Sequence, residues 1–202
     1  SIELLAQPAA AGGAAAGGAE QGELTAIVLR EVERLNALIT ELLEFARPRA
    51  PVLQALELQG AMQELLRVVE NDRRLDGARV ELRAGAPVWV EADAAQLRQV
   101  VWNLLLNAAE ASPRGTPIAI EIRADDGWAQ LTVRDRGPGI PEEHRARIFE
   151  PFFSTKERGT GLGLATVHRI VEEHGGKIEI EGSPEGGAAV TIRLPTTTAA
   201  TS

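Results

Sequence analysis

The sequence predicts an α+β fold in which helices cover one face of a mixed β-sheet. The chain has 202 residues, of which 44% are of hydrophobic type, so it can bury a sizeable core. After residue 52, strand-like and helix-like patterns are mixed, and several neighbouring strand patterns are separated only by hairpin-length turns. This mixture favours a two-layer α/β sandwich over a doubly wound parallel sheet.

Composition excludes several classes of protein. The 21 Lys and Arg residues against 29 Asp and Glu residues give a net charge of −8, which argues against nucleic acid as a partner and against a polybasic membrane tether. The absence of cysteine removes disulfides, thiolate catalysis and Cys-based zinc sites. No apolar run approaches about 18 residues. We therefore expect a cytoplasmic chain, with any membrane anchor of a parent protein lying upstream of Ser1.

The first 47 residues are predicted to be a partial helical hairpin. Residues 8–22 are rich in Ala and Gly and are expected to form a turn after the short apolar stub at residues 2–6. Residues 23–47 have the periodicity of a helical seam, with apolar residues spaced alternately by four and three: Val28, Val32, Leu35, Ile39, Leu42 and Ala46. A lone helix leaves such a seam in water, so we expect a homodimer through helix 23–47.

Pro48 and Pro51 end this helix, so residues 48–51 are predicted to be a linker. A second domain is expected over residues 52–195, followed by a tail at 196–202. Its strands are predicted at 53–58, 78–83, 87–91, 117–123, 128–134, 177–181 and 188–194. Its helices are predicted at 59–75, 93–112 and 161–174.

The helix predicted at 93–112 carries polar side chains beside its apolar face. Asp93 is a candidate N-cap, and apolar residues from Leu97 onward form the core face. Gln96, Asn103, Asn107 and Glu110 fall on an adjoining stripe. Asparagine is a poor helix-interior residue, so the two amides indicate either a ligand or metal site or, on this helix alone, two ordinary surface amides.

Two glycine-rich segments add candidate ligand-binding features. Asp135 follows a predicted strand, and Gly137 and Gly139 would let the backbone approach a flat ligand that Ile140 could cover, although an ordinary glycine turn fits as well. The segment from Gly159 to Leu164 opens a helix, where free N–H groups and the helix dipole suit phosphate. Between these segments lie Lys156 and a cluster of aromatics: Phe149, Phe152 and Phe153.

The ordered set NLLLNAAEA, DRGPGIP, IFEPFFSTK and GTGLGLA resembles the N, G1, F and G2 boxes of bacterial sensor histidine kinases. The resemblance covers about residues 52–195 and implies a Bergerat-type ATP-binding fold, with helix 23–47 similar to the second helix of the family's dimerisation domain. The style of the last two boxes is similar to nitrogen-regulation-type kinases.

The resemblance also implies roles for single residues in a site for ATP and Mg²⁺. Asn107 would bind the metal, Asn103 would lie near the phosphates, and Asp135 would recognise the adenine amine. Asn103 and Lys156 would take part in catalysis. The remaining contacts to nucleotide would come from Ala111, Gly137, Gly139, Ile140, Thr160, Gly161, Leu162, Gly163, Leu164 and Thr191.

The implied activity is transfer of the ATP γ-phosphoryl group to a histidine, for relay to the receiver domain of a response regulator under the control of an upstream sensor domain. His144, His168 and His174 do not fit the acceptor motif, and His174 is expected to be a cationic residue at a helix end. We therefore expect the acceptor upstream of Ser1 and a fragment that cannot autophosphorylate.

Asn103 replaces the glutamate of hydrolysing relatives, which argues against an ATP-driven machine. A regulatory module that binds nucleotide without turnover is the alternative.

Overall fold

The structure is a computed structural model that describes residues 49–69, 72, 75, 77–156, 159–182 and 186–198. It also describes part of the first unit: residues 28–29, 31–32, 35–36, 38–40, 42–43 and 45. The predicted turn at 8–22, the stub at 2–6 and the end of the tail lie outside the described residues. The chain divides into two compact units, Ser1–Ala46 and Arg47–Ser202.

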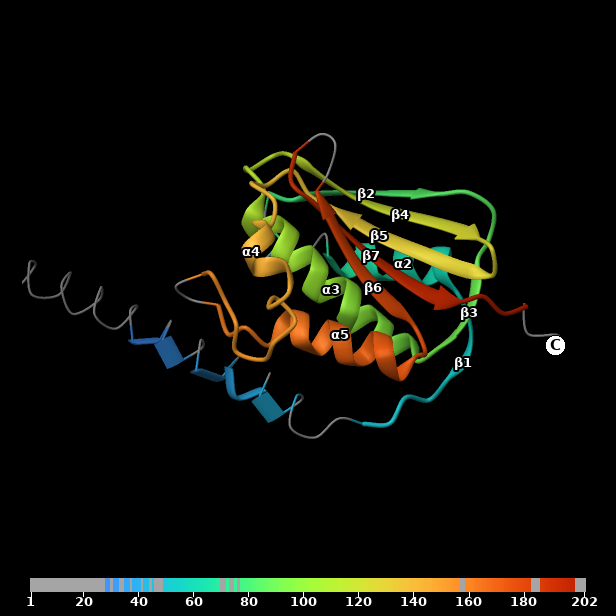
Figure 1. The fold of residues 1–202 in the computed structure, drawn as a ribbon, viewed down its shortest axis with the longest axis horizontal. Helices are drawn as coiled ribbons and strands as arrows, with labels where there is room; N and C mark the ends of the chain where they lie inside the picture. The colour runs from blue at the N-terminus through green and yellow to red at the C-terminus, as the bar shows by residue number, and fades with distance from the viewer. Residues whose placement is uncertain are drawn as a thin grey trace, which may run out of the picture. The chain divides into compact units, whose positions relative to one another are not determined.

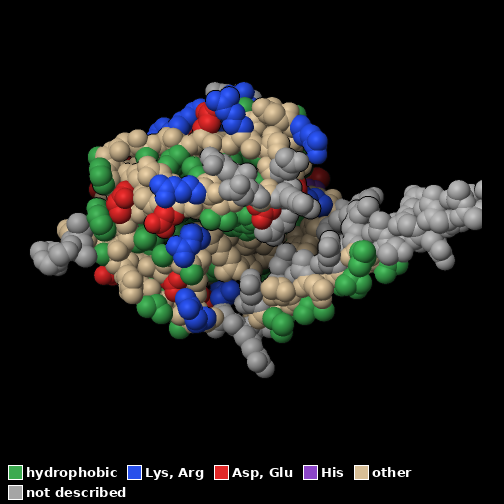
Figure 2. Space-filling model, turned by 180° about the vertical axis from the view of Figure 1, so that it is seen from behind, with side chains coloured by type: hydrophobic (Ala, Val, Ile, Leu, Met, Phe, Trp, Pro, Cys, Tyr) green, Lys and Arg blue, Asp and Glu red, His purple; other side chains and the backbone are tan. Residues whose placement is uncertain are grey.

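The described residues of the first unit are helical, and their seam is uncovered. The side chains of Val28, Leu35 and Ile39 are 60%, 56% and 54% exposed. Apolar side chains are visible along this segment in Figure 2. Within the part of the chain that the structure describes, no helix is long and apolar enough to cross a membrane.

The second unit is built on a five-stranded mixed sheet with the strand order β2-β4-β5-β7-β6 (Figure 1). Only β2 and β4 pair in parallel, and the other neighbours are antiparallel. The outer strands β2 and β6 carry charged residues at alternate positions. The bounds are β2 (Arg79–Ala84), β4 (Pro117–Asp125), β5 (Trp128–Arg134), β6 (Lys177–Gly182) and β7 (Ala188–Pro195).

Helices α2 (Leu58–Val69), α3 (Ala94–Ala111) and α5 (Gly163–Glu173) pack on one side of this sheet (Figure 1). The core lies between the two layers, where Ile120, Leu131 and Ile192 of the sheet are at most 2% exposed. The apolar face of α3 fills the layer with Leu97, Val100, Val101, Leu104, Leu105 and Ala108. The predicted α+β sandwich with a mixed sheet is confirmed.

Three details differ from the sequence prediction. Strands β1 (Gln54–Glu57) and β3 (Trp89–Ala92) pair with each other in a separate antiparallel sheet. Helix α2 ends at Val69 rather than at residue 75, because the N–H of Asp72 turns back to the Val69 carbonyl at 3.1 Å and Leu75 returns to the core. Helix α4 (Glu142–Arg145) was not predicted, since four residues are too few to show helical periodicity.

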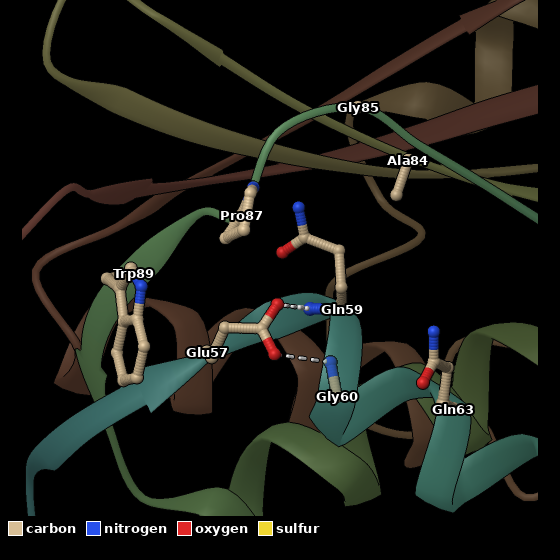
Figure 3. Close-up of a pocket in the computed structure, with 8 residues that line it drawn as sticks. All are labelled: Glu57, Gln59, Gly60, Gln63, Ala84, Gly85, Pro87 and Trp89. Atoms are coloured by element: carbon tan, nitrogen blue, oxygen red, sulfur yellow. Dashed lines mark hydrogen bonds between the residues drawn. The ribbon is translucent and has the colours of Figure 1, made fainter. Parts of the chain in front are cut away.

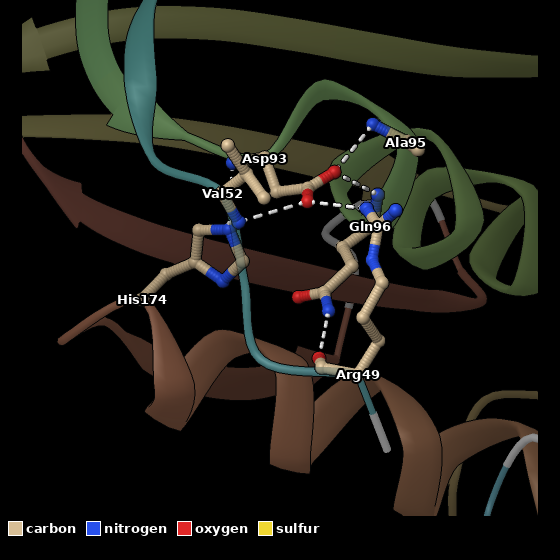
Figure 4. A network of polar contacts seen from close by, with 6 residues as sticks. All are labelled: Arg49, Val52, Asp93, Ala95, Gln96 and His174. Carbon is tan, nitrogen blue, oxygen red and sulfur yellow. Dashed lines mark hydrogen bonds and ion pairs between the residues drawn. The ribbon is translucent and has the colours of Figure 1, made fainter. Parts of the chain in front are cut away.

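Asp93 ties the start of α3 to the segment that enters the second unit (Figure 4). Its Oδ1 accepts the N–H groups of Ala95 and Gln96 at 2.9 and 3.2 Å, which confirms the predicted N-cap. Its Oδ2 accepts the Val52 N–H at 3.0 Å and the Arg49 guanidinium at 2.7 Å. The Gln96 side chain donates to the Arg49 carbonyl at 2.7 Å. Residues 49–52 are therefore docked on α3.

His174 joins the end of α5 to the same point. Its Nδ1 lies 2.7 Å from the Ile170 carbonyl, so that nitrogen carries the proton, and its Nε2 accepts the Asp93 N–H at 3.0 Å. An imidazolium has no lone pair for the second bond. The expectation of a cationic His174 is therefore wrong, because this buried ring is held as a neutral hydrogen-bond bridge.

Asp93 makes the stability of the fold depend on pH. Burial raises the pKa of its carboxyl, but the hydrogen bonds from Val52, Gln96, Ala95 and Arg49 lower the pKa by more, from 3.8 to about 2. Because the pKa is lower in the folded state, the carboxyl group stabilises that state at pH values above its pKa in the unfolded chain. This contribution disappears as the pH falls towards 2. At neutral pH it amounts to about 2 kcal/mol.

We predict that Asp93→Asn lowers the free energy of unfolding at pH 7 by about 2 kcal/mol and flattens its fall between pH 4 and pH 2. Urea denaturation followed by circular dichroism across this pH range measures both effects. Asp125→Asn, at an exposed site, is the matched control. An Asp93→Asn profile parallel to that of the wild type would contradict the prediction.

Candidate nucleotide-binding site

The polar stripe of α3 faces the start of α5 and the segment before it. The amide of Asn103 donates to the Gly163 carbonyl at 3.4 Å, where α5 begins. The amide oxygen of Asn107 accepts from the Lys156 ammonium at 3.3 Å, and Lys156 also forms an ion pair with Glu110. The predicted residues Asn103, Asn107, Lys156 and Gly163 therefore lie together.

A second cluster forms around Asp135, directly after β5. This residue is 8% exposed, and its Oδ1 accepts the N–H groups of Gly137 at 2.8 Å and Ala188 at 3.1 Å. Its own N–H donates to the Ala188 carbonyl at 2.9 Å. Among the described residues, no hydrogen bond goes to its Oδ2. One carboxylate oxygen therefore holds the loop, and the other can accept a hydrogen bond from a ligand.

The glycines of this cluster are required by close packing. A Cβ on Gly137 would lie 2.7 Å from the Ala111 carbonyl oxygen at the end of α3, and a Cβ on Gly187 would lie 2.2 Å from the Asp135 carbonyl oxygen. Gly139 has a φ of 79°, a conformation that glycine adopts without strain. The carbonyl of the next residue, Ile140, accepts from Arg145 at 3.4 Å. The loop after β5 thus packs against both α3 and β7.

The segment before α5 bends sharply at Gly161. Its φ is 69°, and a Cβ there would lie 2.4 Å from the backbone of Phe152. The Thr160 hydroxyl accepts the Leu162 N–H at 3.1 Å, and α5 has no side-chain cap at its N-terminus. Phe152 itself has a φ of 68° and is 66% exposed. Thr160 to Leu164 therefore form a tight turn into an uncapped helix.

Thr191 does not join either cluster. It pairs with Thr132 across β5 and β7, and the two hydroxyls lie 2.9 Å apart. Successive side chains of a strand point to opposite faces, and the neighbouring Ile192 is buried in the core layer. Thr191 therefore lies on the outer face of the sheet, and we withdraw it from the site. Three other residues contact predicted site residues: Ala188, Gly187 and Glu110. The glycine pair before β7 is the sequence signal that could have indicated Ala188 and Gly187.

A separate hollow of about 520 Å³ lies between β1, α2 and the end of β2, away from both clusters (Figure 3). Its polar groups already serve the fold. The Glu57 carboxylate accepts the N–H groups of Gln59 and Gly60 at 3.1 and 3.0 Å, which caps α2. The Gln59 amide holds the loop at Ala86 and Val88. None of the predicted site residues lines this hollow.

Comparison with known proteins identifies the family. Residues 92–198 match a family described as histidine kinase-, DNA gyrase B- and HSP90-like ATPase. The chain belongs to this family. It is 39% identical to the sensor histidine kinase ZraS of Klebsiella oxytoca over 178 residues, which are 87% of this chain and 38% of that protein. The chain therefore spans well under half of this curated relative.

Two solved structures extend the comparison to the fold. The mycobacterial sensor histidine kinase MprB is 33% identical with a TM-score of 0.64, covering 72% of this chain and 98% of that one. The histidine kinase ThkA, in complex with the response regulator protein TrrA, is 28% identical with a TM-score of 0.73, covering 96% of this chain and 53% of that one. The chain thus contains the catalytic ATP-binding domain of a sensor histidine kinase.

We predict that Gly187→Ala lowers the free energy of unfolding by at least about 2 kcal/mol, because the new methyl group collides with Asp135. Gly186→Ala has the same unfavourable φ of 87° but open space around it, so about 1 kcal/mol is expected. Gly182→Ala has neither problem and should change little. Urea denaturation of the three variants tests the order, and equal losses at Gly186 and Gly187 would contradict the clash.

Proposed function

We propose that this chain binds ATP with Mg²⁺ and transfers the γ-phosphoryl group to a histidine outside these 202 residues. The observation that carries the proposal is the second carboxylate oxygen of the buried Asp135: it accepts no hydrogen bond from the residues that the structure describes, while the other oxygen is fixed by two backbone N–H groups. A carboxylate held in this way accepts a hydrogen bond from the exocyclic amine of adenine. Gly137 packs on Ala111 at the end of α3, and Gly139 and Ile140 continue the same loop, so we expect these residues to border the adenine ring.

The phosphates would lie between α3 and the start of α5. The N-terminus of α5 has no side-chain cap, so the N–H groups of its first turn and the positive end of the helix dipole would suit phosphate oxygens. Thr160, Gly161, Leu162, Gly163 and Leu164 form this turn. Asn103 lies beside it, and an amide cannot act as a general base for water near neutral pH. This favours transfer to a protein side chain over hydrolysis.

Mg²⁺ would be held by the amide oxygen of Asn107. No group of three or more Asp, Glu or His side chains within reach of one metal ion occurs among the described residues. An amide oxygen completed by phosphate oxygens and water suits Mg²⁺, which seldom depends on an all-protein cage. The ion would supply charge neutralisation for the transferred phosphoryl group. Asn107, and with it α3, fixes where the phosphates lie.

The acceptor histidine is proposed to lie outside the chain because none of the three histidines present fits the acceptor motif. His174 is buried and uses both ring nitrogens. His168 lies 3.3 Å from Glu172 and packs on Phe149 at 5.0 Å. His144 packs on Phe153 at 5.6 Å. A chain that holds no acceptor cannot autophosphorylate alone.

The same proposal assigns partners. Helix 23–47 would form a homodimer, since its exposed seam needs cover. The likeness to ThkA, solved with TrrA, supports a response regulator receiver domain as the final phosphate acceptor. A sensor domain would belong to the remainder of the parent protein. Because ATP is its substrate, the domain would work in the cytoplasm.

Radiolabelled ATP tests the activity. The chain is incubated with Mg²⁺ and γ-labelled ATP, alone and with the separate acceptor-helix domain of ZraS. We expect no label on the chain, acid-labile label on the added domain, and little phosphate release without an acceptor. Tight ATP binding without any transfer would favour a regulatory nucleotide-binding module, and fast acceptor-independent hydrolysis would contradict the proposal.

Asp135→Asn tests adenine recognition. An amide can still accept the backbone N–H groups, but an amide nitrogen cannot accept the adenine amine. We predict a loss of ATP affinity of about 10- to 100-fold and weaker discrimination against GTP. Isothermal titration calorimetry with non-hydrolysable ATP and GTP analogues measures both, and Asp125→Asn is the control. Unchanged affinity in a folded Asp135→Asn protein would rule out this role.

A further inference from the structure

The positively charged Lys156 contacts the last two polar residues of the α3 stripe, Asn107 and Glu110. Its ammonium lies 3.3 Å from the amide oxygen of Asn107 and in contact with the Glu110 carboxylate. Asn107 and Glu110 are three residues apart, so their side chains point the same way from the helix. The ammonium is thus bound by an amide oxygen and a carboxylate oxygen, two donor types that also suit Mg²⁺.

The backbone around Lys156 connects this contact to the turn before α5. The Lys156 N–H donates to the Ser154 hydroxyl at 3.1 Å, and the Gly159 N–H donates to the Lys156 carbonyl at 3.2 Å. A Cβ on Gly159 would lie 2.2 Å from the Ser154 hydroxyl, so these residues are closely packed. Gly159 leads directly into Thr160 and Gly161. The position of Lys156 is therefore coupled to the proposed phosphate-binding turn.

A lysine ammonium and a magnesium ion compete for the Asn107 oxygen. Both are cations, and their repulsion at a distance of a few ångströms opposes simultaneous binding. Nucleotide-bound Mg²⁺ at Asn107 would therefore favour release of the ammonium. Because the ion pair with Glu110 is solvent-exposed, with side chains 41% and 57% accessible, the contact is weak enough to be exchanged.

We propose that Lys156 is a placeholder for the metal: without nucleotide it occupies the cation position at Asn107, Glu110 holds it there, and the Mg²⁺–nucleotide complex displaces it. This inference rests on the proposed function, because that function assigns Mg²⁺ to Asn107. Lys156 and Glu110 are positioning residues in this scheme. They make the contact of the Lys156 ammonium with α3 compete with metal binding.

The lysine content of the chain allows a direct test of the contact with Glu110. Lys156 and Lys177 are the only lysines. The full chain, free of nucleotide, is treated with a limiting amine-acylating reagent, and the labelling rate of each lysine is measured by mass spectrometry. We expect Glu110→Gln to raise the rate at Lys156 about two- to fivefold and to leave Lys177 unchanged. Glu64→Gln, at an exposed carboxylate on α2, should change neither rate.

Metal dependence tests the displacement. Binding of a non-hydrolysable ATP analogue is titrated against Mg²⁺ in the wild type, in Lys156→Met and in the control Lys177→Met. Removing the competing ammonium should lower the Mg²⁺ concentration for half-maximal binding about threefold or more in Lys156→Met only. If Lys156 bound only phosphate, this substitution would instead weaken binding equally at every Mg²⁺ concentration, which would overturn the inference.

The two proposals fail in different ways. Nucleotide binding that ignores Mg²⁺, or that is unchanged in Asp135→Asn, would reject the proposed function and the inference with it. If nucleotide binding depends on Mg²⁺ and responds to Asp135→Asn, but Glu110→Gln leaves the labelling rate of Lys156 unchanged, only the placeholder role is rejected.

Discussion

The position of α3 is the constraint on which the rest of the second unit depends. At its start, Asp93 accepts four hydrogen bonds, from its own helix and from the incoming segment at 49–52, while His174 ties the same residue to the end of α5. At its end, Gly137 lies so close to Ala111 that no side chain fits between them. A helix held at both ends presents Asn103 and Asn107 at fixed positions, as their proposed role in nucleotide binding requires.

Much of this arrangement could be predicted from the sequence because it depends on local patterns. The alternation of Ile118, Ile120 and Ile122 marks β4, and Asp93 before an apolar helical stripe marks the start of α3. The four motifs, taken in order, led to one hypothesis that includes Asn107, Asp135 and the turn at which α5 begins. Local periodicity is sufficient for the strand and for the start of the helix, whereas the common hypothesis depends on the resemblance of the motifs to those of sensor histidine kinases.

The features that could not be predicted depend on contacts between distant segments. The pairing of β1 with β3 joins strands more than thirty residues apart, and nothing in either strand specifies its partner. The neutral state of His174 follows from a bond across eighty-one residues. Thr191 is a different case, because its buried neighbour Ile192 already implied that the threonine faces outward.

The two outer strands of the sheet have a consequence for how the chain associates with itself. In β6, Lys177, Glu179 and Glu181 are exposed at alternate positions, and in β2 the exposed Arg79 and Arg83 flank the half-buried Glu81. Charged residues on edge strands discourage another sheet from extending them and so protect against aggregation. Fibril-like stacking of the catalytic domain is thereby disfavoured even at high local concentration.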